Sequence, residues 1–119
     1  MKFFLVDYEN VNSSGLNGID LIGQDDHVVI FYGPNSNTVS FSIMQKIREM
    51  DIEIELYELK QSAHNAIDFQ LSVYLGYLIA KYPEAEFYII SKDKGYQAVI
   101  EFCKDNFISD NEEKVLKYD

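Results

Sequence analysis

Residues 87–100 read FYIISKDKGYQAVI, an apolar run that stops at polar residues and continues into a helical pattern. Residues 3–12, FFLVDYENVN, begin in the same way and stop at Asp7. A short, continuous apolar run is typical of a strand that is buried on both faces, as in a parallel sheet. The second run is followed by Asp93, so the sequence places one carboxylate at the end of each of two buried strands.

Strands and helices alternate along the rest of the chain. The predicted strands cover residues 2–6, 28–32, 53–59 and 87–91, with Phe107 and Ile108 beginning a short fifth strand. The predicted helices cover residues 38–50, 65–82 and 95–104. This alternation predicts an α/β fold, a three-layer sandwich around a central parallel sheet of four or five strands. The strand at 53–59 alternates polar and apolar residues, which places it at an exposed edge.

The predicted helices differ in how much apolar surface they carry. The helix at 65–82 has an apolar stripe at spacings of three and four, made of Ile67, Leu71, Leu75, Leu78, Ile79 and Tyr82. Val73, Tyr77 and Ala80 widen the stripe, so we expect this helix to be heavily buried. In the helix at 95–104 we expect Val99, Phe102 and Cys103 to face inward.

Composition limits the class of protein. A chain of 119 residues with 47% hydrophobic residues fits one globular domain, 1–119. The apolar start ends at Asp7, too early for a secretion signal, and no apolar run is long enough to cross a membrane. With a single cysteine, we expect a cytoplasmic protein that needs no membrane. The net charge of −10 argues against broad binding of polyanions by this chain alone and leaves room for a basic partner.

Three acids are expected at one rim of the sheet. Asp7 and Asp93 follow strands whose carboxyl ends meet if the strands are neighbours, and Asp68 lies in the first turns of the long helix. Close carboxylates repel each other, and a hard divalent cation such as Mg²⁺ or Mn²⁺ relieves the repulsion. Zinc is not expected, because the single cysteine and the two histidines show no ligand spacing. Each acid also has a structural interpretation, as a loop starter, a helix cap or a partner of the helix dipole.

The residues around these acids extend the candidate site. Asn10 is either a turn residue or a group that orients Asp7 or touches the substrate. Ser91 is either a plain strand-end hydroxyl or a ligand to a metal-bound water. Asn65 is a helix N-cap or a substrate contact, and Lys94 is solvated or meets phosphate. Glu9 faces solvent or adds a fourth carboxylate.

Three blocks of sequence resemble the PIN-like superfamily, nearest its NYN branch. The blocks are VDYENV, HNAIDFQL with YLGYL after it, and IISKDKGY. The resemblance implies a compact α/β sandwich and a Mg²⁺- or Mn²⁺-dependent ribonuclease. It implies that Asp7, Asp68 and Asp93 hold the metal and catalyse, while Asn10 and Ser91 belong to conserved elements of the family pattern. Gly95 stands where the family often has a further acid, and His64 stands where close relatives often have lysine.

Function is therefore predicted with alternatives. The leading prediction is a metal-dependent endoribonuclease that hydrolyses phosphodiesters of single-stranded or structured RNA with an activated water. The first alternative is a non-catalytic PIN-like module that holds a protein or nucleic-acid partner. The net negative charge and the glycine at position 95 favour this alternative. The second is a phosphoacceptor domain of the receiver type, against which the absence of an aspartate at the tip of strand 53–59 speaks. A homodimer is compatible with each reading.

Overall fold

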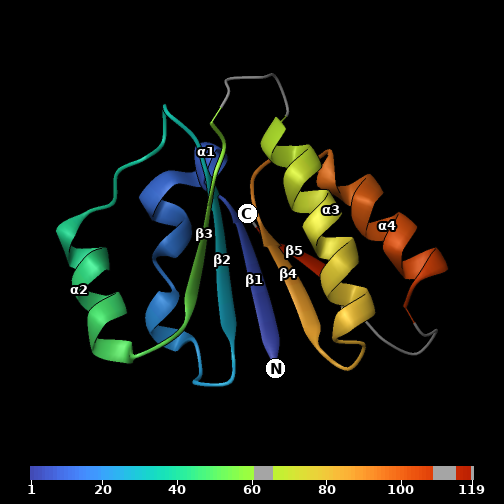
Figure 1. Ribbon diagram of the computed structural model, residues 1–119, viewed down its shortest axis with the longest axis horizontal. Coiled ribbons are helices and arrows are strands. Elements are labelled where there is room, and N and C mark those ends of the chain that lie inside the picture. Colours follow the sequence, from blue (N-terminus) through green and yellow to red (C-terminus); the bar gives the residue numbers. More distant parts are fainter. Residues whose placement is uncertain (61–65, 109–114, 119) are drawn as a thin grey trace.

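The computed structural model describes residues 1–60, 66–108 and 115–118 as a sheet with helices on both faces (Figure 1). The strands are β1 (Lys2–Asp7), β2 (His27–Tyr32), β3 (Ile54–Glu58), β4 (Glu86–Ile90) and β5 (Val115–Tyr118). The helices are α1 (Tyr8–Val11), η1 (Asn12–Leu16), η2 (Ile19–Leu21), α2 (Phe41–Met50), α3 (Ala66–Lys81) and α4 (Tyr96–Asn106). The predicted α/β sandwich with a parallel sheet is confirmed.

The five strands are all parallel and follow the order β3-β2-β1-β4-β5. The chain moves outward from β1 to β3 and then returns to place β4 on the other side of β1. The order therefore reverses between β1 and β4, and such a switch point at the carboxyl ends of strands is where open α/β sheets bind ligands. In Figure 1 these carboxyl ends lie at the top, where α3 and α4 begin.

Each face of the sheet has its own apolar core. On one face, α3 and α4 pack through Leu71, Leu75 and Ile100 against strand residues such as Leu5 and Ile89. On the opposite face, the segment from α1 to α2 covers a second core around Val6, Val28 and Ile43. Strand side chains alternate between the two cores, which explains why the central strands are apolar without interruption.

Three predictions about the apolar residues were wrong. The fifth strand is β5 at Val115–Tyr118, whereas Phe107 caps the carboxyl end of α4. Val73 is 74% exposed, Tyr77 is 51% exposed and Ala80 is also exposed, because α3 packs on the sheet with one stripe only. Phe102 is 58% exposed for the same reason, since α4 turns Cys103 and Ile100 inward instead.

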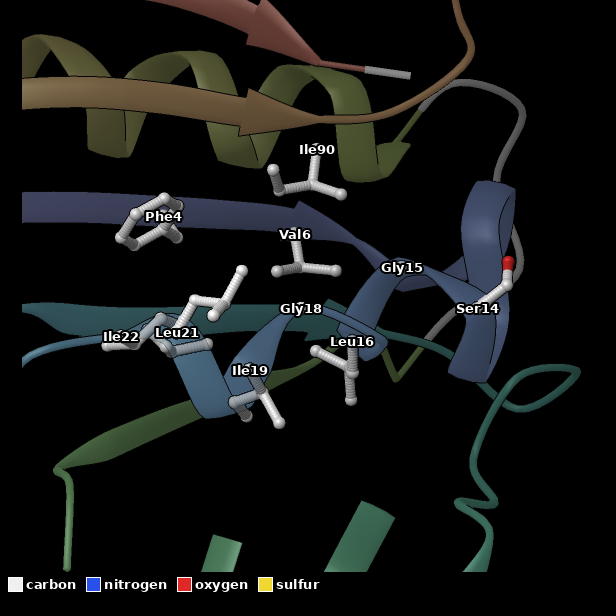
Figure 2. A pocket seen from close by; sticks show the side chains of 11 residues that line it. Phe4, Val6, Ser14, Gly15, Leu16, Gly18, Ile19, Leu21, Ile22 and Ile90 are labelled. Carbon is white, nitrogen blue, oxygen red and sulfur yellow. The ribbon is translucent and has the colours of Figure 1, made fainter. Parts of the chain in front are cut away.

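The cover over the second core is incomplete. An apolar pocket of about 380 Å³ opens between the η1–η2 segment and strands β1 and β4 (Figure 2). Ser14 supplies the one polar side chain that lines it, and its hydroxyl donates to the Val11 carbonyl 2.7 Å away. The pocket therefore holds no acid, base or nucleophile that suggests chemistry. In the described ranges, no helix is both long and apolar enough to cross a bilayer.

The two faces of α3 predict opposite effects of truncation. Leu75→Ala removes a fully buried side chain, and we expect it to lower the free energy of unfolding by about 2–5 kcal/mol. Val73→Ala, two positions away on the exposed face, should change it by less than about 0.5 kcal/mol. Urea unfolding of both variants measures the difference. Equal losses would mean that α3 is buried all round.

Candidate active site

The structure brings the three predicted acids to the carboxyl edge of the sheet. Asp7 is the last residue of β1 and is only 3% exposed. Asp68 lies in the first turn of α3, and Asp93 lies in the loop that joins β4 to α4. Because β1 and β4 are neighbours in the sheet, the two strand ends and the start of α3 converge there.

A tyrosine hydroxyl joins two of these acids. Tyr96, in the first turn of α4, has its ring in the core, and its hydroxyl lies 3.0 Å from Asp68 Oδ1 and 3.3 Å from Asp7 Oδ2. Burial and the charges of both acids hold the pKa of Tyr96 above its usual range, so the phenol keeps its proton and donates it. A phenol has one hydrogen, so two carboxylates share a single donor.

A second chain of hydrogen bonds runs through Ser91. The Ser91 hydroxyl is fully buried and donates to Asp7 Oδ2 at 3.2 Å. Ser91 Oγ in turn accepts a hydrogen bond from the Asp93 amide at 3.0 Å, and Asp93 Oδ1 accepts one from the Gly95 amide at 2.8 Å. This network fixes the loop after β4 relative to the end of β1.

Asn10 links α1 to the same loop. Its side-chain carbonyl accepts the backbone amide of Lys92 at 2.6 Å. The residue therefore ties two segments that are far apart in the sequence. The Asn10 backbone amide also lowers the pKa of the Asp7 carboxyl, and a role of the Asn10 side chain in orienting Asp7 stays a prediction.

The electrostatics of the site penalise negative charge. Burial, together with the charge of Asp68, raises the pKa of Asp7 to about 6, although Ser91, the Asn10 amide and Tyr96 each lower it. The pKa of Asp68 is also raised, first by burial and then by Asp93 and Glu9, with Tyr96 acting in the opposite direction. Among the described residues, no lysine or arginine lies within 4.0 Å of these carboxylates. The acids are therefore gathered without a protein cation to balance them.

The donor set fits a hard divalent cation. All the polar side chains that meet here offer oxygen, which is what Mg²⁺ and Mn²⁺ prefer. The part of the chain that the structure describes contains no group of three or more His, Cys, Asp or Glu side chains arranged to hold an ion. Mg²⁺ commonly uses one or two carboxylates and keeps several waters. That Asp7, Asp68 and Asp93 together hold such an ion stays a prediction.

The other predicted site residues lie around this centre. Lys94 is exposed, and His64 and Asn65 fall outside the described residues. Glu9 is exposed and acts on Asp68 through its charge. A Cβ added to Gly95 would lie 3.1 Å from Asp93 Oδ1, so the space where the family often has a further acid is tight here.

Tyr96 is the site residue that sequence reasoning missed. An aromatic side chain is usually interpreted as a packing group, and the Tyr96 ring does pack in the core. The available signal was its position, because the first turn of α4 follows β4 and must lie at the carboxyl edge. A tyrosine there, in place of a purely apolar ring, brings a hydroxyl to the acids.

Comparison with known families decides what this arrangement belongs to. A family model described as "PIN domain" matches residues 1–112. The chain is a PIN domain. PIN domains are generally nucleases that bind nucleic acids and use divalent metal ions, in agreement with an oxygen-lined acidic site. Neither the curated proteins nor the solved structures gave a match.

The raised pKa of Asp7 predicts an unusual pH dependence of stability. The folded state keeps the Asp7 proton up to a pKa of about 6, whereas an unfolded aspartate loses it near 3.8. The folded state therefore binds more protons in this window, and its stability falls as the pH rises through it. From about pH 4 to about pH 7, we expect Asp7→Asn to gain about 2–3 kcal/mol in free energy of unfolding relative to the unmodified protein.

Urea unfolding across that pH range, in the presence of a chelator, measures the difference. Asp20→Asn removes an exposed carboxylate and controls for the change in net charge. A difference between Asp7→Asn and the unmodified protein that stays constant with pH would contradict the prediction.

Proposed function

We propose that this PIN domain is a metal-dependent endoribonuclease of the NYN branch, acting in the cytoplasm on single-stranded or structured RNA. The observation that carries the proposal is the pair Asp7 and Asp68, which share one hydroxyl and both have a raised pKa. Perturbed acids at a switch point are typical of functional sites. RNA, in preference to DNA, rests on the resemblance of the sequence to NYN domains.

Asp7 and Asp68 would hold the Mg²⁺ or Mn²⁺ ion, with Asp93 beside Asp68 as the third catalytic acid. When bound, such an ion neutralises the carboxylates, polarises the scissile phosphate and lowers the pKa of a water. Ser91, which follows β4, and Tyr96, in α4, both donate to Asp7 Oδ2 and so keep the Asp7 carboxylate in one orientation. In this proposal, Asp93 would orient the attacking water or accept its proton.

The surrounding residues supply substrate contacts in this proposal. Lys94 is exposed beside Asp93 and is free to meet a phosphate, and His64 and Asn65 precede α3 in the sequence. The crowding at Gly95 favours one ion over two, because a further acid there would press against Asp93. The non-catalytic module remains the alternative, favoured by the same glycine and by the net charge of −10. Membership of the PIN family sets the receiver-type reading aside.

Cleavage of labelled single-stranded RNA tests the function. With Mg²⁺ or Mn²⁺ present, we expect Asp7→Asn and Asp93→Asn to lose at least about a hundredfold in rate, because charge neutralisation at the phosphate is worth several kcal/mol. Asp105→Asn, which removes an exposed acid from α4, should cleave at the normal rate. If the folded, unmodified protein cleaves no RNA with either metal, the non-catalytic module is the better reading.

Metal binding separates the role of Tyr96 from simple packing. Tyr96→Phe keeps the ring and removes the hydroxyl that joins Asp7 and Asp68, and we expect Mn²⁺ affinity to fall about tenfold. Tyr8→Phe is the matched control, since Tyr8 is also buried but its hydroxyl contacts Ser13 and the Thr38 carbonyl. Calorimetric titration with Mn²⁺ measures both variants. Equal affinities for the two would remove Tyr96 from the proposed site.

A further inference from the structure

In the part of the chain that the structure describes, no strand pairs with the outer edge of β3. β3 ends the strand order of the sheet, so in the described residues only β2 pairs with it. The Glu53 carbonyl and the Leu59 amide both bond to β2. Since the direction of backbone groups alternates along a parallel strand, the amides and carbonyls of Ile54, Leu56 and Glu58 point to the free edge. These groups form a ready template for another strand.

Apolar grooves lie beside this edge on both faces of the sheet. On the α3 side, a shallow groove of about 790 Å³ is lined by Tyr57 of β3 and by Phe69, Val73 and Tyr77 of α3. Phe69 and Val73 are 68% and 74% exposed. Exposed apolar side chains that lie together in this way are typical of an interaction site. On the α2 side, a second groove of about 350 Å³ contains Leu56, which is 61% exposed. Figure 1 shows β3 between α2 and α3.

The pair of grooves favours a strand as the occupant. Side chains of an added strand point alternately to the two faces of a sheet, so one extended segment fills both grooves and pairs with the backbone between them. A helix would fill one groove and leave the backbone of Ile54, Leu56 and Glu58 unpaired. Addition of a strand to an exposed edge is an established mode of peptide recognition.

The charge of the edge selects the chemistry of that strand. Glu53, Glu55 and Glu58 give this short stretch three carboxylates and no lysine or arginine. A second copy of the chain would bring the same three acids to the ladder, and like charges on facing strands are destabilising. RNA is disfavoured for the same reason. A segment with Lys or Arg opposite these acids is attracted instead.

We propose that the free edge of β3 binds an extended, basic and aliphatic segment of another protein, which adds as a sixth strand. Its aliphatic side chains enter the grooves beside Leu56 and Val73, and its Lys or Arg side chains meet Glu55 and Glu58. This interaction does not depend on the proposed nuclease activity.

The experiment starts from a random library of displayed peptides of about ten residues, which is within the usual range of strand lengths. Peptides that bind the unmodified protein are selected from it. We expect enrichment of peptides that combine Lys or Arg with Val, Ile or Leu. Anisotropy titrations of the selected peptides then compare Leu56→Pro with Leu56→Val. Proline removes one outward amide without touching the β2 ladder and is tolerated on an edge strand, whereas valine keeps both the amide and the apolar contact.

Leu56→Pro should raise the dissociation constant about tenfold, and Leu56→Val should leave it nearly unchanged. Glu55→Gln combined with Glu58→Gln should weaken binding severalfold. If Leu56→Pro does not fold, amide shift mapping on the unmodified protein replaces it, and the largest shifts should fall on Ile54, Leu56 and Glu58.

Four outcomes overturn the proposal. They are a library that yields no binder, selected peptides that are acidic, binding that is insensitive to Leu56→Pro, and shifts confined to another surface. A dimer of the unmodified protein that Leu56→Pro dissolves would assign the edge to a second copy. A labelled single-stranded RNA that is released by Leu56→Pro would assign the edge to nucleic acid.

Discussion

The buried carboxylate of Asp7 is the constraint around which the candidate site is built. A charge at the end of the central strand costs about 3 kcal/mol at neutral pH, judged from a pKa raised from 3.8 to about 6. Hydrogen bonds from neighbouring elements offset part of this cost. Ser91, at the end of β4, and Tyr96, in α4, both donate to the Asp7 carboxylate. A fold that keeps such a costly group is more readily explained by a ligand for that group than by stability.

The nature of that ligand follows from what the site lacks. In the described residues, no basic side chain pairs with Asp7, Asp68 or Asp93, and the single hydrogen of Tyr96 serves two acids at once. A monovalent counterion from solvent would offset only part of this charge. A divalent ion with oxygen ligands offsets most of it, and PIN domains as a family use divalent ions. Local electrostatics and family membership therefore lead to the same class of cofactor by independent routes.

The sequence predicted the sheet, and the position of the acids at its carboxyl edge, because both depend on local patterns. A continuous apolar run followed by an acid, as at Asp7, predicts both that the strand is buried and where it ends. Tyr96 was missed because its ring obeys the packing pattern, while the direction of its hydroxyl depends on how α4 sits against α3. Val73 was misplaced for the opposite reason, since an apolar residue widens a helical stripe whether or not a neighbour covers it. A sequence pattern does not show which residue of another element a side chain contacts, nor whether any neighbour covers it.

The two proposals meet in the charge of the molecule. If the domain cleaves RNA as proposed, its net charge of −10 opposes the approach of this polyanion to the carboxyl edge, and a bound metal ion would offset only the charge nearest the scissile phosphate. β3 ends at Glu58, on the same edge of the parallel sheet as the end of β1. A basic strand added beside β3 would therefore lie next to the path of the RNA and lower its electrostatic repulsion. Partner binding would then raise RNA affinity most at low ionic strength, because screening by salt removes the repulsion that the partner offsets.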